Sequence, residues 1–265
     1  LKKNYYSKIT LPYKLEESFK AFKEKDCFDI KFAHQEDKDK WFCKIGAQNT
    51  NLSFAVVGDS HALSLKKVFD KAAKEKKISG LFTGFSGCIP LLDIYTIRPD
   101  QVEKNCKKLN SKLFEYIKDK NIKKIFLVAR WTYYTDGNYE KTEFSHISKI
   151  NNYSSNKKNS RKAFEYGLSN TIKKYDQIGV NVIFLHQVPL QNFAPHYIYL
   201  HSIKKNKINY EKLIYNLSVD YEKHTLLQKF VREKVNSINT NLIFNQIDPG
   251  LIFCDKVKCI VGTKD

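Results

Sequence analysis

Short apolar runs recur along the chain from residue 52 onward. They are rich in Ile, Phe, Val and Leu, and they read LSFAVV, ISGLFTGF, KKIFLVA, NVIFLHQV and NLIFNQI. Continuous apolar runs of this length are typical of strands that are buried on both faces, as in a parallel sheet. The pattern therefore predicts about five parallel strands.

Segments with helical periodicity lie between these runs. In residues 62–77, apolar residues at helical spacing predict one buried face, made of Leu65, Val68, Phe69, Ala72 and Ala73. Further helices are predicted from Pro99 to about residue 121, over 160–179 with a stop at Gly179, and over 210–236 as one helix or two. The alternation of strands and helices predicts an α/β fold, a three-layer sandwich with a central parallel sheet flanked by helices.

The distribution of the apolar runs along the chain also suggests the domain organisation. Residues 1–50 are polar and irregular, which favours a linker or lead-in arm, and residues 51–265 would form one domain. The chain is 42% apolar, enough for a proper core. It contains no run of 18 apolar residues, so no membrane-spanning segment is predicted.

The first apolar run ends abruptly in Gly58-Asp59-Ser60-His61. This sequence lies at the carboxyl end of a predicted parallel strand, and functional residues of parallel sheets gather at that end. Gly58 permits a tight turn, and Asp59 or Ser60 can cap the following helix. One interpretation is therefore that Ser60 serves only as the N-cap of this helix. Ser60 as a nucleophile is the other, because its own N–H and the positive end of the helix would stabilise an oxyanion.

The net charge of +18 raises the possibility of nucleic-acid binding. The lysines are scattered over nearly all predicted helices rather than gathered in an arginine-rich stripe, so no nucleic-acid partner is predicted. The sequence has neither a glycine-rich phosphate loop nor a cluster of acids at ligand spacing, so neither a cofactor nor a metal is predicted.

Six cysteines fall into three local couples, which are Cys27 with Cys43, Cys88 with Cys106, and Cys254 with Cys259. They lack the doubled CxxC spacing of a structural zinc site. Six cysteines allow 15 pairings, and adjacency alone does not choose among them. Three closed loops would indicate an oxidising compartment such as a periplasm, whereas six buried thiols are the alternative.

Several segments, taken in order, resemble one bacterial family. VVGDSHA resembles block I of the SGNH hydrolases, whose fold is flavodoxin-like. WFCKIG before it, FSGCIPLL after the second strand, LVARWTYY after the third, QVPL after the fourth and DPGLIFCDKVKC near the end resemble the SGNH domain that is fused to acyltransferase-3 membrane proteins. These matches cover about 240 of the 265 positions in the expected order.

The resemblance assigns roles to particular residues. Ser60 would be the nucleophile, and the N–H groups of Ser60 and Gly87 would form the oxyanion hole. Arg130 stands near the place of an asparagine in general SGNH enzymes, where it would assist the oxyanion, hold a carboxylate or sugar, or be structural. Trp131 would stack on a sugar ring or belong to the core.

The family's last block, D-x-x-H, supplies the general base and the carboxylate that orients it. No D-x-x-H occurs in this sequence, which ends at CIVGTKD, and the resemblance places the motif about ten residues after Asp265. His61 lies next to the nucleophile, His186 ends the fourth strand, and Glu143 to His146 have the motif spacing but come too early in the chain. None of these is expected to replace the motif.

The function that the resemblance implies is acyl transfer. The domain would lie on the periplasmic face of a bacterial inner membrane, as the soluble part of a membrane protein. A fused or partner membrane acyltransferase domain would supply an acyl group, most simply acetyl. Ser60 would carry it as an ester to a hydroxyl of a polysaccharide or glycolipid, such as lipopolysaccharide. The alternatives are a carbohydrate O-acetyl esterase and a catalytically inactive carbohydrate-binding module.

Overall fold

The computed structural model describes residues 27–30, 41–48, 50–97, 102–150, 156–193, 210–238 and 241–260, with the backbone alone for residues 102–105, 210 and 211. A six-stranded sheet forms its centre, in the order β1-β3-β2-β5-β7-β9. The strands are β1 (Cys43–Gly46), β2 (Leu52–Gly58), β3 (Ser79–Gly84), β5 (Lys124–Val128), β7 (Asn181–Leu185) and β9 (Phe244–Ile247).

Five of these strands correspond to the five apolar runs and are parallel to one another. The sixth, β1, pairs antiparallel with β3 at the edge of the sheet. The predicted α/β fold is confirmed. The range 1–50, expected to be a lead-in arm, thus contains one strand of the sheet, a strand too short and too mixed in polarity to show in the apolar pattern.

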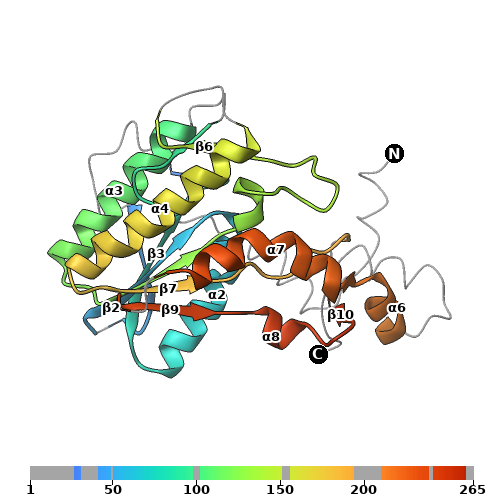
Figure 1. Ribbon diagram of the computed structural model, residues 1–265. Helices are drawn as coiled ribbons and strands as arrows, with labels where there is room; N and C mark the ends of the chain where they lie inside the picture. The colour runs from blue at the N-terminus through green and yellow to red at the C-terminus, as the bar shows by residue number, and fades with distance from the viewer. Residues whose placement is uncertain are drawn as a thin grey trace, which may run out of the picture.

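Helices cover both faces of the sheet (Figure 1). α2 (Ser60–Glu75) packs on one face, and α3 (Val102–Asp119), α4 (Lys157–Gln177) and α7 (Tyr221–Asn236) lie on the other. The smaller elements are β4 (Tyr95–Thr96), η4 (Trp131–Tyr134), β6 (Ile147–Ser148), α6 (Tyr210–Leu217), β8 (Val219–Asp220), α8 (Gly250–Phe253) and β10 (Lys258–Cys259). Within the described residues, every helix is too short or too polar to cross a bilayer.

The helical predictions hold in type but differ in detail. The segment 210–236 is two helices, α6 and α7, separated by β8, which pairs with β10. α4 ends at Gln177, and Gly179 follows with a positive φ of 67°. Pro99, the predicted first turn of α3, lies outside the described residues. Val68 and Ala72 of α2, both expected to be buried, are exposed, Val68 to 61%. The helix packs mainly through Ala62, Leu63 and the correctly predicted Ala73.

The six cysteines form the three local couples as disulfides. They join Cys27 to Cys43, Cys88 to Cys106, and Cys254 to Cys259, with Cα–Cα distances of 5.6, 5.4 and 3.8 Å. The prediction of disulfides is confirmed. The first disulfide links residues 27–30 to β1. In the same segment, Phe28 forms a parallel bridge with Gly84, the last residue of β3.

The order of the strands defines a switch point at β2. β3 lies on one side of β2 and β5 on the other, so the chain leaves β2 in one direction and later returns past it. A crevice forms at the carboxyl end of the strand where the order reverses. Gly58, the last residue of β2, is buried there between β3 and β5.

Gly58→Ala is expected to destabilise the protein severely. A Cβ at this position would stand 1.6 Å from the carbonyl oxygen of Val128, and a backbone atom of a paired strand cannot move aside as a side chain does. We expect the free energy of unfolding in urea to fall by about 3 kcal/mol or more.

Gly179→Ala is the control for this variant. Nothing lies within 4 Å of a Cβ built there, and only the positive φ opposes it. A loss of roughly 1–2 kcal/mol is expected. Equal losses in the two variants would show that the close approach of β2 and β5 does not constrain the sheet.

Candidate active site

The turn after β2 is organised by Asp59 and leaves Ser60 exposed. Asp59 is the N-cap of α2 and is 2% exposed. Its Oδ1 accepts a hydrogen bond from the N–H of His61 at 2.9 Å. Ser60 is the first residue of the helix, so its hydroxyl is not used for capping. The interpretation of Ser60 as the N-cap is therefore wrong, and Asp59 takes that role because a carboxylate favours the positive end of a helix.

Asp59 also joins the turn to the neighbouring strand. Its Oδ2 accepts hydrogen bonds from the N–H of Arg130 at 2.9 Å and from the hydroxyl of Tyr134 at 3.0 Å. Arg130 follows β5, and Tyr134 is the last residue of η4. One buried carboxylate therefore fixes the ends of β2 and β5 relative to each other, and with them the position of Ser60.

Ser60 opens into a pocket of about 370 Å³ at this edge of the sheet. The pocket is lined by Asp59, Ser60, Gly87, Arg130, Tyr133, Thr142, Glu143 and Phe144. The structure thus brings together three of the residues that the sequence singles out, Ser60, Gly87 and Arg130. Tyr133 comes from η4, and Glu143 and Phe144 come from the loop between η4 and β6, whose position depends on tertiary contacts.

Gly87 lies in the loop after β3 with a positive φ of 66°. Among the described residues, neither its N–H nor that of Ser60 donates a hydrogen bond to protein. Two N–H groups that line one pocket beside an exposed hydroxyl are the arrangement that an oxyanion hole requires.

The loop that carries Gly87 is held from two directions. Asp29 accepts hydrogen bonds from the N–H of Ser86 at 2.6 Å and from its hydroxyl at 2.8 Å. On the other side, the Asn110 amide donates to the carbonyls of Ile89 and Leu91 at 2.9 and 3.1 Å. The Cys88–Cys106 disulfide adds a covalent link to α3. These contacts keep the loop in place without a ligand.

Arg130 is half-buried in the wall of the Ser60 pocket. Its Nη2 lies 2.7 Å from Glu143, and its guanidinium lies over the ring of Tyr133. The buried Nε of Arg130 has no hydrogen-bond partner in the described part of the chain. The ion pair orients the guanidinium and balances its charge, so the pocket beside Ser60 carries little net charge at the arginine.

Trp131 does not stack on a sugar. Its side chain is fully buried, its Nε1 donates to the carbonyl of Leu185 at 2.7 Å, and its ring stacks on Phe184 with centroids 4.3 Å apart. The predicted substrate-binding role is wrong, because the start of η4 turns the side chain into the core under β7. The alternative of a core residue is correct.

No described histidine hydrogen-bonds to Ser60. His61 is half-buried, and desolvation lowers its pKa despite the opposing charge of Asp59. His146 contacts the hydroxyl of Ser160 at 3.1 Å, and His186 contacts Gln246 at 2.9 Å. Glu143, whose spacing from His146 resembles the last family block, pairs with Arg130 instead.

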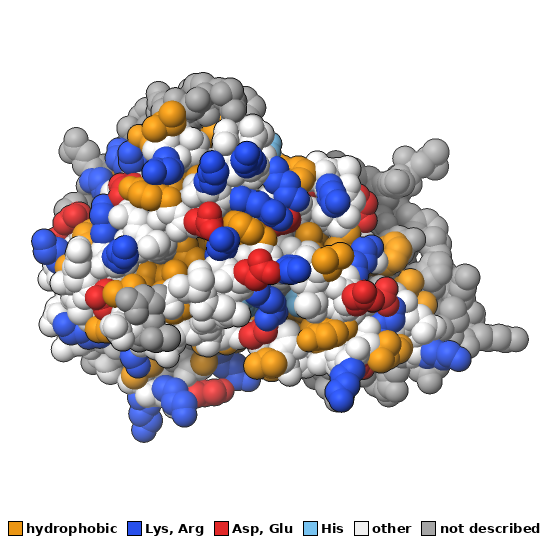
Figure 2. Space-filling view, in the orientation of Figure 1, with side chains coloured by type: hydrophobic (Ala, Val, Ile, Leu, Met, Phe, Trp, Pro, Cys, Tyr) orange, Lys and Arg blue, Asp and Glu red, His pale blue; other side chains and the backbone are white. Residues whose placement is uncertain are grey.

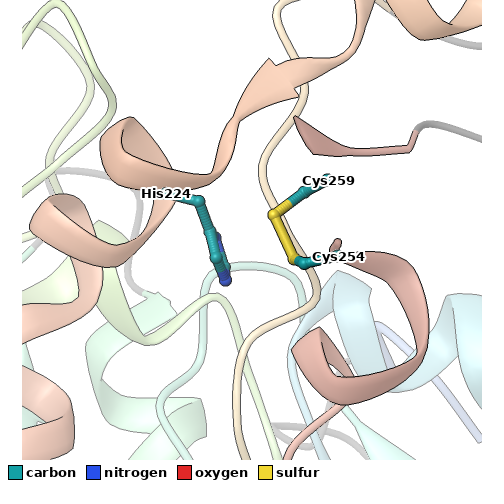
Figure 3. A group of neighbouring side chains, drawn as sticks. All are labelled: His224, Cys254 and Cys259. Carbon is teal, nitrogen blue, oxygen red and sulfur yellow. A yellow bond between two sulfur atoms is a disulfide. The ribbon is translucent and has the colours of Figure 1, made fainter. Parts of the chain in front are cut away.

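His224 packs beside the Cys254–Cys259 disulfide (Figure 3), with ligand-type atoms of the three residues within 4.8 Å of one another. The two sulfurs are bonded to each other, so they offer no thiolate to a metal. His224 Nδ1 lies 3.3 Å from the Gln228 amide, whereas its buried Nε2 has no hydrogen-bond partner among the described residues. Burial, with the nearby charge of Arg232, lowers the pKa of His224 to about 4.

The family of the chain follows from a match over nearly all of this structure. A family model described as "SGNH domain (fused to AT3 domains)" matches residues 26–264. The chain belongs to this family. The match includes β1, which is a strand of the central sheet, and residues 27–30, which contact the loop at Ser86. Both segments are therefore part of the domain.

Among solved structures, the chain is similar to the periplasmic domain of the lipopolysaccharide acetyltransferase of Salmonella serovar Paratyphi A. The two are 15% identical with a TM-score of 0.60, and the alignment covers 96% of this chain and 85% of that chain. At this identity the likeness concerns the fold. No curated protein sequence matches the chain.

Asp59→Asn is expected to lower the free energy of unfolding by about 2–3 kcal/mol, because one acceptor oxygen becomes an NH₂ group that faces donors. Tyr134→Phe removes only one of the three hydrogen bonds and should cost about 1 kcal/mol. Urea unfolding measures both losses. If Asp59→Asn cost no more than Tyr134→Phe, the carboxylate would not be the centre of this turn.

The buried His224 predicts that stability falls in weak acid. Its folded pKa of about 4 lies below the unfolded value of 6.5, so the unfolded state binds the proton first as the pH falls. Its contribution is complete above pH 6.5 and is lost toward pH 4, with a slope of up to about 1.4 kcal/mol per pH unit. His61 and His186 act in the same direction, since burial lowers both of their pKa values.

The unfolding free energy is measured in urea between pH 4 and pH 7.5 for the wild type and for His224→Gln. The variant should lose less stability over this range, whatever its stability at neutral pH. Parallel curves for the two proteins would contradict the prediction.

Proposed function

We propose that this domain transfers an acyl group, most simply acetyl, through an ester on Ser60 to a hydroxyl of a polysaccharide or glycolipid. The observation that carries the proposal is the exposed Ser60 hydroxyl, freed from capping by Asp59, in one pocket with the N–H groups of Ser60 and Gly87. The family, SGNH domains fused to AT3 domains, supports it, as does the name of the structural neighbour, a lipopolysaccharide acetyltransferase.

The chemistry is a double displacement. The Oγ of Ser60 attacks the carbonyl carbon of the donor, and the N–H groups of Ser60 and Gly87 stabilise the resulting oxyanion. The bond to the donor's leaving group breaks, and that group departs with the proton from Ser60. The sugar hydroxyl then attacks the ester, the bond between Oγ and the acyl carbon breaks, and the sugar's proton returns to Oγ. Arg130 assists by holding the oxyanion or a polar group of the sugar.

The general base in this proposal is the histidine of the D-x-x-H motif, oriented by its aspartate, as the family resemblance implies. His146, His186 and His224 contact side chains other than Ser60, which is consistent with this assignment. The donor would be supplied by a fused or partner membrane acyltransferase domain. A periplasmic location fits the three disulfides, which persist in oxidising compartments.

Ser60→Ala should abolish the formation of an acyl-enzyme. The protein is incubated with 4-nitrophenyl acetate, and its intact mass is measured before and after. We expect a gain of one acetyl group in the wild type and none in Ser60→Ala, because Oγ of Ser60 is the proposed nucleophile that carries the ester.

Ser64→Ala is the matched control. Ser64 is an exposed serine one turn further along α2, and its hydroxyl donates to the carbonyl of Ser60 at 2.9 Å. It should acetylate like the wild type. A wild-type protein that carries the D-x-x-H motif and stays unmodified while folded would contradict acyl-enzyme chemistry and favour a carbohydrate-binding module. Added oligosaccharide then distinguishes a transferase, which yields O-acetyl sugar, from an esterase, which yields acetate.

A further inference from the structure

We infer that the acceptor is an acidic glycan, a sugar chain bearing carboxylate or phosphate groups, bound along a groove that leads from Ser60 to a basic end between α4 and α7. The inference rests on the proposed function in one respect, which is that the sugar must reach Ser60. The groove itself is a property of the structure.

Three hollows join to form this groove. The Ser60 pocket shares Arg130 and Glu143 with a second hollow of about 640 Å³. The second hollow shares Asn138, Tyr139 and Lys223 with a third of about 540 Å³. The shared walls make the hollows neighbours. Each has the volume of a small-molecule pocket, so the three together can hold several sugar units rather than one small molecule.

The middle hollow offers the contacts that a sugar ring uses. Tyr139 stands between the second and third hollows, fixed by its hydroxyl, which donates to the carbonyl of Leu190 at 2.7 Å. Phe193 and the exposed Asn192 line the same hollow. Aromatic faces beside amide groups provide both an apolar surface and hydrogen bonds, as sugars require.

Charge changes along the groove. In the middle hollow Arg130 and Lys223 are balanced by Glu140 and Glu143. In the third hollow five cationic side chains face two anionic ones, an excess of three positive charges: Lys141, Lys157, Arg161, Lys223 and Lys229 against Asp136 and Glu233. Figure 2 shows Lys and Arg side chains gathered over this part of the surface, above α7.

The cations of the third hollow are only partly neutralised within the fold. Lys229 lies 4.0 Å from Glu233. Lys157 and Arg161 share the single carboxylate of Asp136. In the described part of the chain, Lys141 and Lys223 have no carboxylate partner, and Lys223 lies over the Tyr139 ring, 4.7 Å from its centroid. Unpaired cations around a concave surface favour a ligand with negative charges.

This arrangement selects an acidic glycan over a nucleic acid. The excess of positive charge is confined to the far end of the groove, while the part next to Ser60 is nearly balanced, so a polymer with a charge on every unit has no continuous track. The reacting hydroxyl would lie at the neutral end and an acidic group further along the chain at the basic end.

The test measures binding without an acyl donor, so its outcome does not depend on whether Ser60 is acylated. Calorimetric titrations use hexagalacturonate, a hexasaccharide carrying mannose 6-phosphate, and neutral maltohexaose. At least one acidic probe should bind more tightly than maltohexaose, and its affinity should fall when the ionic strength is raised from about 20 mM to about 300 mM.

Two double variants locate the site. Lys141→Glu with Lys223→Glu should weaken binding of the acidic probe at least about tenfold, since two attractions become repulsions. Lys67→Glu with Lys71→Glu makes the same change of charge on exposed positions of α2, on the opposite face of the sheet, and should leave the affinity as in the wild type. Circular dichroism establishes that both proteins are folded.

The inference is overturned if neither acidic probe binds better than maltohexaose, or if the two double variants weaken binding equally. It is also overturned if single-stranded polycytidylate binds more tightly than both acidic glycans at the same salt concentration. A protein that binds the acidic probe through Lys141 and Lys223 but never acylates Ser60 would keep this inference and refute the proposed function.

Discussion

The carboxylate of Asp59 is the contact on which the site depends. It lies in the interior, where an ionised group is stable only if hydrogen bonds replace the water it has lost. Three donors do so, from the start of α2, the end of β5 and the end of η4. The start of α2 is distant in sequence from β5 and η4, and one side chain holds the three elements together at the switch point of the sheet. The same contact releases Ser60 from capping, so the structural and the chemical roles of the turn belong to different residues.

Much of this was predictable from the sequence because it depends on local patterns. Apolar runs gave the five parallel strands, and Gly58-Asp59-Ser60-His61 marked the turn between a strand and a helix. β1 was missed because Cys43–Gly46 is short and has no clear polarity pattern. Its strand character comes from pairing with β3 and from the disulfide to Cys27, which are interactions at long range.

The site was predictable in part. Ser60, Gly87 and Arg130 follow parallel strands, and the carboxyl ends of such strands meet at one edge. Trp131 follows β5, as Arg130 does, but a side chain after the end of a strand can point either into the pocket or into the core. Only the packing against Phe184 determines that Trp131 points into the core. Glu143 and Asp29 gave no usable signal, because a single acid in a polar loop looks like any solvated residue until the fold brings its partner close.

The position of residues 27–30 has a consequence for the supply of substrate. Phe28 bridges to Gly84, and Asp29 holds the Ser86 loop, so this segment lies at the edge of the sheet that carries Ser60 rather than at the opposite one. A group joined to the chain on the N-terminal side of Cys27 would therefore be tethered to the edge of the sheet that carries the proposed nucleophile. Tethering makes an encounter intramolecular, with an effective concentration in the millimolar range for short flexible linkers. A weakly bound donor on such a tether would still occupy the pocket often, and affinity for the free donor would not have to be high.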